Sequence, residues 1–389
     1  MIRGGASDLA IFGGQPLFAQ ARTPGQLANR DPERFFALAA GAFDRRWFTN
    51  QGPLISELEE RLGQFHGAGH CVAFANASFA MILALRAVAC PGAREVVLPA
   101  LAFSGLPHLI RWAGLEPRYC EVDPVRHTLA PDALAGIIGP DTAVVLAADQ
   151  ANALCDIDAI EALTRAAGVP LVLDSVHGIG GSYGAAPVGS RGTATIFSLH
   201  ADTLINGFEG GYLTTQDPDL AAALIRQRSF GFGDVGVPVE LGLNAKLNEL
   251  HVAMALSNLP HLPAIVADNA ARLAAYRTGF ADLAWTSFAD YSAAPGTDGV
   301  VLLKVEPGSP FSRDELIDIL RAENALVRPH HTPLADHRFP IADRIAGAFI
   351  RMPAGDLTTL EDVERLAGLF ARLEANAGSI VDRLRRSRA

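Results

Sequence analysis

Short apolar runs alternate with longer helical segments through the first 215 residues, and this alternation is the feature that most restricts the fold. The runs predicted to be strands cover 70–75, 95–99, 116–122, 142–148, 169–174, 194–199 and 210–215. Helices are predicted between them, from Pro53 onward and at 78–89, 103–114 and 157–168. Short strands that are apolar throughout must be covered on both faces, which favours a mostly parallel sheet between two layers of helices. The predicted fold class is therefore α/β.

The N-terminal region contrasts with this pattern. Its first forty residues show neither helical nor strand periodicity, so we expect them to be irregular. The helix that begins at Pro53 is predicted to carry one apolar stripe, made of Leu54, Leu58, Leu62 and Phe65.

The last third of the chain predicts a smaller α+β unit. A helical stretch at 245–259 ends before Pro260, where we place the hinge between domains. Beyond it we expect a helical tract at 264–283, strands at 300–305 and 325–329, a helix capped by Ser312 and Glu315 as a capping box, and a final helix from Leu357. The expected domains are an N-terminal extension with a large domain (1–259) and a small C-terminal domain (260–389).

Composition narrows the class of protein. The chain has 389 residues, 49% of them hydrophobic, which suffices for a large core. Its net charge of −10 argues against nucleic acid as the main partner. We find no signal-peptide pattern, no long uninterrupted apolar window and no zinc-type cysteine pair. We therefore expect a cytoplasmic protein without a membrane span or a metal site.

Polar and aromatic residues follow several predicted strands, at the edge where α/β sheets bind ligands. Asn76, Ala77 and Ser78 open a helix directly after a strand, which suits a phosphate, although Asn and Ser are also ordinary helix caps. Phe103 suits stacking on a ligand ring, although it also fits a core position. Asp174 suits pairing with a ring nitrogen, although it also fits the cap of a turn.

Two further residues extend this pattern. His177 lies three residues beyond Asp174, where an imidazole can bind a ring oxygen or move protons, and Ser198 ends the next strand with a hydroxyl. Their order along the chain matches the needs of pyridoxal 5′-phosphate (PLP), which has a phosphate, an aromatic ring and a pyridine nitrogen.

Longer motifs carry a family resemblance nearly from end to end. They include "AIFGGQPLF" (10–18), "EVVLPALAF" (95–103), "LVLDSVHGIG" (171–180), "IFSLHADTLINGFEGGYLTT" (196–215) and "LGLNAKLNEL" (241–250). With these motifs the chain resembles the DegT/StrS-type nucleotide-sugar aminotransferases, which are PLP-dependent enzymes of fold type I. Within that family it is most similar to the aminocyclitol and 3-amino-5-hydroxybenzoate synthase-like branch.

The resemblance implies a mostly parallel large-domain sheet with a small C-terminal α+β domain, and a homodimer with each active site at the subunit interface. It implies PLP or its amine form, pyridoxamine 5′-phosphate (PMP), as cofactor and a keto sugar or cyclitol as small-molecule ligand. The implied roles are pairing with the pyridine nitrogen for Asp174, stacking for Phe103, proximity to the 3-oxygen for His177, and phosphate binding for Asn76, Ala77, Ser78, Ser198 and, across the dimer, Asn244.

The loop at 198–211, "SLHADTLINGFEGG", departs from the family pattern. The family's loop carries the lysine that forms a Schiff base with PLP, and an ungapped alignment places Thr203 there. A hydroxyl cannot form that bond and is a poor base. Of the two lysines of the chain, Lys246 lies in another motif and Lys304 in the strand predicted at 300–305. The catalytic candidates are therefore Thr203, at the lysine position, with His177 and His200 as the nearest bases.

Other departures affect the substrate side of the site. Ala102 replaces a hydroxyl residue before Phe103, and Asp149 and Asn152 replace a histidine and an aromatic residue.

Three interpretations follow. In the first, the protein binds PLP or PMP non-covalently and carries out non-transaminating chemistry, as some family dehydratases do. In the second, it is a partner-dependent aminotransferase. In the third, it is a non-catalytic binding or regulatory relative that keeps the dimer and the pocket. Retention of Asp174 favours a bound cofactor, because burying an unpaired carboxylate is costly.

Overall fold

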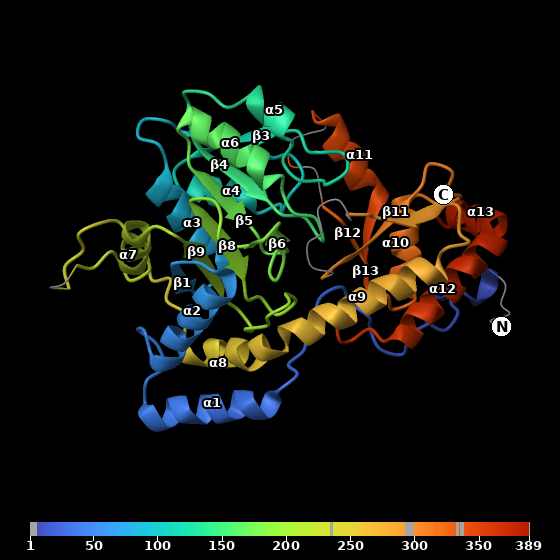
Figure 1. The fold of residues 1–389 in the computed structure, drawn as a ribbon. Coiled ribbons are helices and arrows are strands. Elements are labelled where there is room, and N and C mark those ends of the chain that lie inside the picture. Colours follow the sequence, from blue (N-terminus) through green and yellow to red (C-terminus); the bar gives the residue numbers. More distant parts are fainter. Residues whose placement is uncertain (1–5, 234–235, 292–298, 332–333, 335–337, 389) are drawn as a thin grey trace.

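The computed structural model describes residues 6–233, 236–291, 299–331, 334 and 338–388. Figure 1 shows two units, each built on its own sheet and joined by one long helical tract.

The first unit is built on a seven-stranded sheet. Its strands lie in the order β1 (His70–Phe74), β9 (Gly211–Thr215), β8 (Ala194–Ser198), β5 (Leu171–Asp174), β4 (Thr142–Ala148), β2 (Glu95–Pro99) and β3 (Glu116–Cys120). β9 runs antiparallel to both of its neighbours, and the other neighbouring pairs are parallel. The predicted α/β class with a mostly parallel sheet is confirmed.

Helices cover both faces of this sheet because neighbouring side chains of each strand point to opposite faces. In β2, Val96 and Leu98 pack with one group of helices, while Val97 packs on the other side. The first face is covered by α3 (Ala77–Val88), α4 (Leu106–Trp112) and α7 (Pro218–Gln227), and the second by α2 (Pro53–His66), α6 (Ile157–Ala167) and α8 (Glu249–Asn258). A short helix, α5 (Pro131–Ala135), and a small hairpin, β6 (Ser182–Tyr183) and β7 (Ala186–Pro187), complete the unit.

Two expectations for the N-terminal region are wrong. The first forty residues are not all irregular, because α1 (Pro32–Arg45) begins there, with the Asp31 side chain accepting a hydrogen bond from the Arg34 amide and Pro32 at the first position. Phe65 is not part of the buried stripe of α2, since it is 38% exposed. The stripe continues four residues after Leu62, to His66.

Several predicted boundaries move by a few residues because capping side chains set them. The helix predicted at 245–259 begins at Glu249, since the Asn248 side chain accepts hydrogen bonds from the two amides that follow Glu249. The last predicted helix begins at Leu360, after Thr359 as its cap. The capping box of Ser312 and Glu315 is present as predicted.

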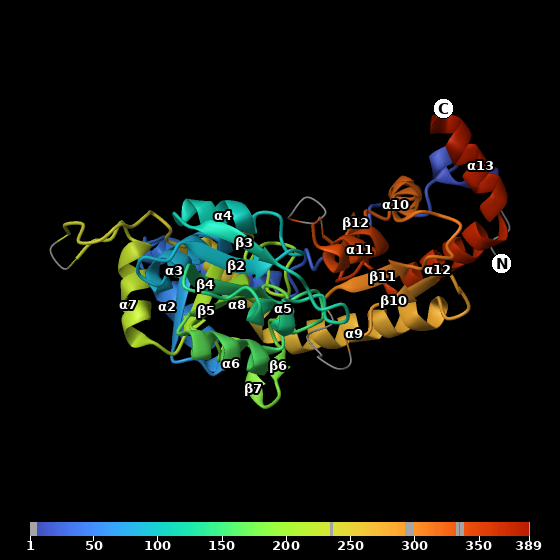
Figure 2. The same cartoon turned by 90° about the horizontal axis from the view of Figure 1, so that it is seen from above.

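The second unit contains an antiparallel sheet of four strands in the order β10 (Thr286–Phe288), β11 (Val301–Val305), β13 (Phe349–Met352) and β12 (Arg328–Pro329). Its helices are α10 (Arg313–Ala322), α11 (Pro340–Ala348), α12 (Leu360–Ala375) and α13 (Ala377–Arg388). The long helix α9 (Leu262–Gly279) follows α8 and packs against α12, so it connects the two units (Figure 2).

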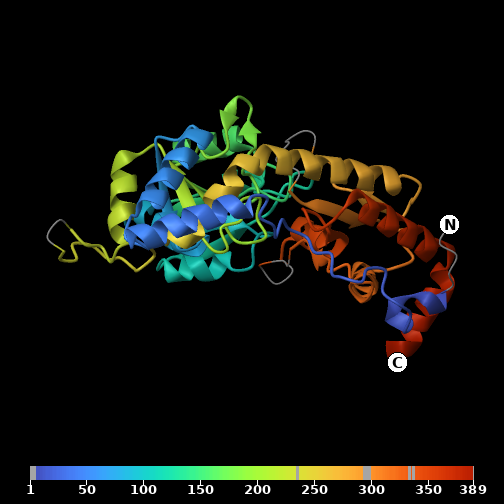
Figure 3. The ribbon, with the colours of Figure 1, turned by 90° about the horizontal axis from the view of Figure 1, so that it is seen from below.

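The N-terminal segment lies along the second unit (Figure 3). Leu9 and Phe18 are fully buried in the apolar core of that unit, and Arg22 forms a parallel bridge with Ala325. We keep the division into 1–259 and 260–389 as a proposal, with the addition that the first residues of the chain complete the core of the C-terminal unit.

One helical tract, Glu249–Gly279, is long and apolar enough by length and composition to cross a membrane. Half of its most apolar window is buried in the fold, where α8 packs on α1 and α2. A core helix of a globular fold can meet the same criteria of length and composition.

Candidate active site

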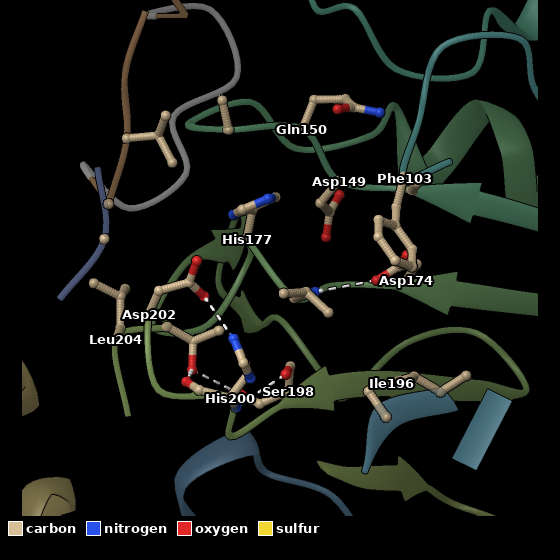
Figure 4. Close-up of a pocket in the computed structure, with 18 of the residues that line it drawn as sticks. Phe103, Asp149, Gln150, Asp174, His177, Ile196, Ser198, His200, Asp202 and Leu204 are labelled. Carbon is tan, nitrogen blue, oxygen red and sulfur yellow. Dashed lines mark hydrogen bonds and ion pairs between the residues drawn. The ribbon is translucent and has the colours of Figure 1, made fainter. Parts of the chain in front are cut away.

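A cavity of about 580 Å³ lies between the carboxyl edge of the large sheet and strands β12 and β13 of the second unit. The loops after β2, β4, β5 and β8 all contribute to its wall, because parallel strands end at one edge (Figure 4). Most of the residues predicted from the sequence meet here: Asn76, Ala77, Ser78, Phe103, Asp149, Asp174, His177, Ser198, His200 and Thr203.

One wall of the cavity is the N-terminus of α3. The Asn76 side chain accepts a hydrogen bond from the Phe79 amide at 2.9 Å, so it caps the helix. The amides of Ala77 and Ser78 have no acceptor inside the helix, which is the usual arrangement for binding an anion. Gly211 makes this wall possible, because a Cβ atom at that position would lie 2.3 Å from the Ala77 nitrogen.

Phe103 is an exposed wall residue and not a core residue. Its side chain is 57% exposed and borders the cavity. Gly105 provides room for the ring, since a Cβ atom there would lie 2.4 Å from it. Ala102, by contrast, is buried. The position therefore offers an aromatic surface to a planar ligand.

Asp174 ends β5 with its carboxylate toward the cavity (Figure 4). Burial, together with the nearby Asp149 carboxylate, raises its pKa to about 6, and the long 3.4 Å hydrogen bond from the Val176 amide only partly offsets this. A buried carboxylate with so little compensation suits a cationic N–H group of a ligand.

The Asp149 carboxylate has more hydrogen-bond partners within the protein than the Asp174 carboxylate has. It accepts hydrogen bonds from the Cys155 amide at 2.8 Å, the Ser175 hydroxyl at 2.7 Å and the Tyr183 hydroxyl at 2.9 Å. Burial raises its pKa despite these bonds. Its carboxylate therefore organises the end of β4.

Asn152 does not border the cavity. It is 7% exposed, donates to the Val300 carbonyl and accepts from the Val300 amide at 3.1 Å. This pair of bonds fastens the loop after β4 to the second unit.

Ser198, His200 and Thr203 are among the residues of the loop at 198–211 that border the cavity. The Ser198 hydroxyl accepts a hydrogen bond from the His200 amide at 3.1 Å. The Thr203 hydroxyl lies 2.8 Å from the His200 carbonyl and 3.1 Å from the Ile205 carbonyl, so its single proton serves the loop backbone. Within the described part of the chain, the Thr203 hydroxyl therefore contacts backbone carbonyls and has no base partner.

The two candidate bases have opposite surroundings. His177 lies with Nε2 at 3.4 Å from the Arg351 guanidinium, and burial and this cation lower its pKa to about 3. His200 is half exposed; its Nδ1 lies 2.7 Å from the Glu209 carboxylate, and its Nε2 lies 4.0 Å from Asp202. A carboxylate that orients an imidazole is the arrangement expected of a proton-transfer pair.

No lysine lines the cavity within the part of the chain that the structure describes. Lys246 lies over the ring of Phe230, 4.9 Å from its centroid, and Lys304 pairs with Glu306 at 2.7 Å. Asn244 is exposed outside the cavity, beside the end of β1, where the Ala245 carbonyl accepts from the Ala75 amide. Its predicted contact with a partner subunit stays a prediction.

Sequence reasoning missed several cavity residues: Gln150, Asp202, Arg328, His331 and Arg351. Arg351 lies on β13 and pairs in register with Arg328 on β12. These strands reach the cavity only because the two units fold against each other. Arg328 lies in the strand predicted at 325–329, but no local pattern marks Arg351.

Comparison with known proteins supports the predicted family. The sequence profile of the DegT/DnrJ/EryC1/StrS aminotransferase family matches residues 30–370. A curated relative, dTDP-4-amino-4,6-dideoxy-D-glucose transaminase of Escherichia coli, is 26% identical over 79% of this chain and 86% of its own.

Solved structures agree with this. DesI, crystallised in the presence of its TDP-sugar product, has a TM-score of 0.91 and 32% identity, over 99% of this chain and 100% of its own. E. coli GDP-4-keto-6-deoxy-D-mannose-3-dehydratase with bound hydrated PLP shares the fold, with a TM-score of 0.81 and 15% identity over 90% of this chain and 99% of its own. The profile covers most of the chain, and the chain therefore belongs to the DegT/DnrJ/EryC1/StrS aminotransferase family, whose members use PLP or PMP.

Proposed function

We propose that this protein binds PLP or PMP non-covalently and acts on a nucleotide-linked keto sugar or cyclitol without the covalent lysine step of ordinary transamination. The observation that carries the proposal is a cavity that keeps an under-compensated Asp174 beside an exposed Phe103, yet has no lysine among its described lining residues.

The residues present fit the cofactor. The Ala77 and Ser78 amides and the Ser198 hydroxyl would hold its phosphate, Phe103 would cover its ring, and Asp174 would pair with its pyridine nitrogen. When bound, the cofactor supplies an electron sink for a carbanion on the substrate. Asp174 favours that chemistry because an ionised carboxylate keeps the pyridine nitrogen protonated.

We propose that His200 is the residue that transfers a proton to or from the bound substrate. Glu209 orients its imidazole at 2.7 Å, and the ring borders the cavity. His177 is the weaker candidate, since a pKa near 3 makes it a poor proton acceptor at neutral pH. We assign His177 to contacts with the ligand or with Arg351, and Thr203 to holding the loop at the position that the family's lysine occupies.

The relatives support the substrate class. The named E. coli transaminase acts on a dTDP-linked sugar, and the DesI structure was determined in the presence of a TDP-sugar product. We also propose a cytoplasmic homodimer with the active site at the interface, supported by four free cysteines and by the exposed, cavity-bordering Phe103.

Absorbance titration with PLP and PMP tests the proposal. We expect the visible band of added PLP to shift saturably with protein concentration and to be lost when the sample is desalted, and at least ~10-fold weaker binding by Asp174→Asn. Thr203→Lys should retain the band through desalting, whereas Thr203→Met, of similar length but without an amine, should not.

The outcomes separate the alternatives. A wild-type protein that binds neither PLP nor PMP contradicts the proposal and supports the non-catalytic relative, which the lysine-free lining also favours. A band that survives desalting in the wild type would show that a lysine, from this chain or from a partner, reaches the cofactor, as a partner-dependent aminotransferase requires.

A further inference from the structure

Arg351 presents a buried positive charge to the cavity and forms no direct ion pair among the described residues, although the Asp202 carboxylate acts on it from farther away. Its Nε–H group is buried and has no acceptor in that part of the chain. Two ring nitrogens lie near its Nη2 atom, at 3.4 Å in His177 and 3.3 Å in His331. Burial lowers its pKa to about 10. A guanidinium in such surroundings is costly unless an anion accompanies it.

The contact with His331 cannot be a hydrogen bond from Arg351. The Gln150 amide nitrogen donates to the Leu101 carbonyl at 2.9 Å, so the Gln150 oxygen faces His331 and accepts from its Nε2–H at 2.8 Å. That ring nitrogen is therefore protonated and cannot accept a second proton. A guanidinium has five N–H donors, and the described residues leave it mainly His177 as an acceptor.

His330 is a second unsatisfied group on the same wall. It is 2% exposed, borders the cavity, and neither ring nitrogen has a hydrogen-bond partner within the described residues. Burial lowers its pKa far below the usual range, so the ring is neutral and offers one donor and one acceptor.

We propose that this cluster, the arginine end of the cavity (Arg351, His330, His331 and Gln150), binds the carboxylate of a ligand. Two N–H groups of Arg351 would hold its two oxygens in the bidentate geometry that guanidinium and carboxylate share. His330 would serve a neighbouring oxygen of the same ligand. The site requires no cofactor and goes beyond the proposed function.

Charge balance favours a carboxylate over a phosphate. Arg328 on the adjacent strand faces Asp202 at 3.7 Å, which offsets its charge, and the surrounding imidazoles are neutral. Among the described residues of this end of the cavity, Asp202 acts on both arginines, so at most one positive charge is left without an anion, and a carboxylate carries one negative charge. A phosphate monoester carries nearly two, and the amides at the N-terminus of α3 already suit a phosphate elsewhere in the cavity.

Such a carboxylate could belong to a sugar acid or to an open-chain acid. D-glucuronate and succinate are the probes that distinguish them, with D-glucose as the neutral control. Calorimetric titration of the cofactor-free full-length protein should give a dissociation constant on the order of 1 mM for the better acid and no binding of glucose. A preference for glucuronate assigns a sugar acid, and a preference for succinate an open-chain acid.

Arg351→Met should weaken binding of the better acid by at least ~10-fold, the loss expected for a charge-assisted pair. Lys304→Met is the matched control, because it removes one positive charge from the same sheet outside the cavity lining and should leave binding unchanged. Inorganic phosphate binding, attributed to α3, should persist in both variants and shows that the cavity is intact. If Arg351→Met also loses the ability to bind phosphate, Arg351→Gln is tested in its place. It too should bind the better acid at least ~10-fold more weakly while it retains phosphate binding.

Equal acid binding by wild type and the Arg351 variant that retains phosphate would overturn the proposal, as would no binding of either acid by the wild type. Failure of the PLP titration leaves this result untouched, because every measurement here is made without cofactor.

Discussion

The two ends of the cavity are built in different ways. The ring-and-phosphate end (Ala77, Ser78, Phe103 and Asp174) comes from the first unit, and each member ends a strand, lies in the loop after one or begins a helix. The arginine end joins residues after β4 and β12 with Arg351 within β13, so it exists only where two sheets meet. The first end is specified by local sequence, and the second by tertiary packing.

The largest expected effect tests whether the two ends are independent. In Gly211→Ala the new methyl group would lie 2.3 Å from the Ala77 nitrogen, a backbone atom that cannot move aside without displacing α3. We expect a loss of about 2–4 kcal/mol in unfolding free energy by chemical denaturation. Phosphate affinity should fall by at least ~10-fold, while acid binding at the arginine end persists.

Gly347→Ala is the matched control, because no atom lies within 4 Å of a Cβ placed there. It should change unfolding free energy by less than about 1 kcal/mol. Loss of acid binding in a folded Gly211→Ala protein would show that the two ends act as one site.

The next effect concerns how much the buried Asp174 carboxylate lowers the unfolding free energy of the cofactor-free protein. Its pKa is raised from 3.8 to about 6, so the folded state binds the proton more tightly than the unfolded state does. The stability that this proton contributes is present below pH 3.8 and is lost as pH rises through about 6.

Asp174→Asn should therefore stabilise the cofactor-free protein by up to about 3 kcal/mol at pH 8, because it removes a buried charge. The gain should shrink steadily between pH 6 and pH 4 in denaturation series. Asp158→Asn, at an exposed helix position, should show no such trend. A gain that does not vary with pH would contradict the assigned carboxylate environment.

The same contrast between the two ends of the cavity decides which parts of the fold and site can be predicted from the sequence. The strand ends placed Phe103, Asp174, His177 and Ser198 together correctly, because parallel strands share an edge. No periodicity could reveal Arg351, since an arginine within a short β-strand has the pattern of an exposed position. Two local signals were overlooked: Asp31 before Pro32 marks the start of α1, and four-residue spacing favours His66 over Phe65.

A smaller effect tests the ring-and-phosphate end directly. Phe103→Ala removes a 57% exposed ring, so the fold loses little buried area and should keep its unfolding free energy within about 1 kcal/mol. Cofactor affinity in the absorbance titration should fall by about 10-fold, the loss expected for one aromatic stacking contact. Phe103→Tyr should retain most of the affinity. Unchanged affinity in Phe103→Ala would remove this ring from the proposed site while leaving the arginine end unaffected.

The smallest expected effect decides what Thr203 does. If its hydroxyl serves only the backbone of the loop at 198–211, replacing it with a group of the same shape should cost about one hydrogen bond. Thr203→Val should therefore lower unfolding free energy by about 1 kcal/mol and leave PLP affinity unchanged, whereas Thr203→Ser should match the wild type in both measurements. A catalytic hydroxyl would give a different result, since Thr203→Val would then abolish turnover of a keto-sugar substrate without a comparable loss of stability. Because the His200 carbonyl lies 2.8 Å from this hydroxyl, the first result would also assign Thr203 to holding His200 in place beside Glu209.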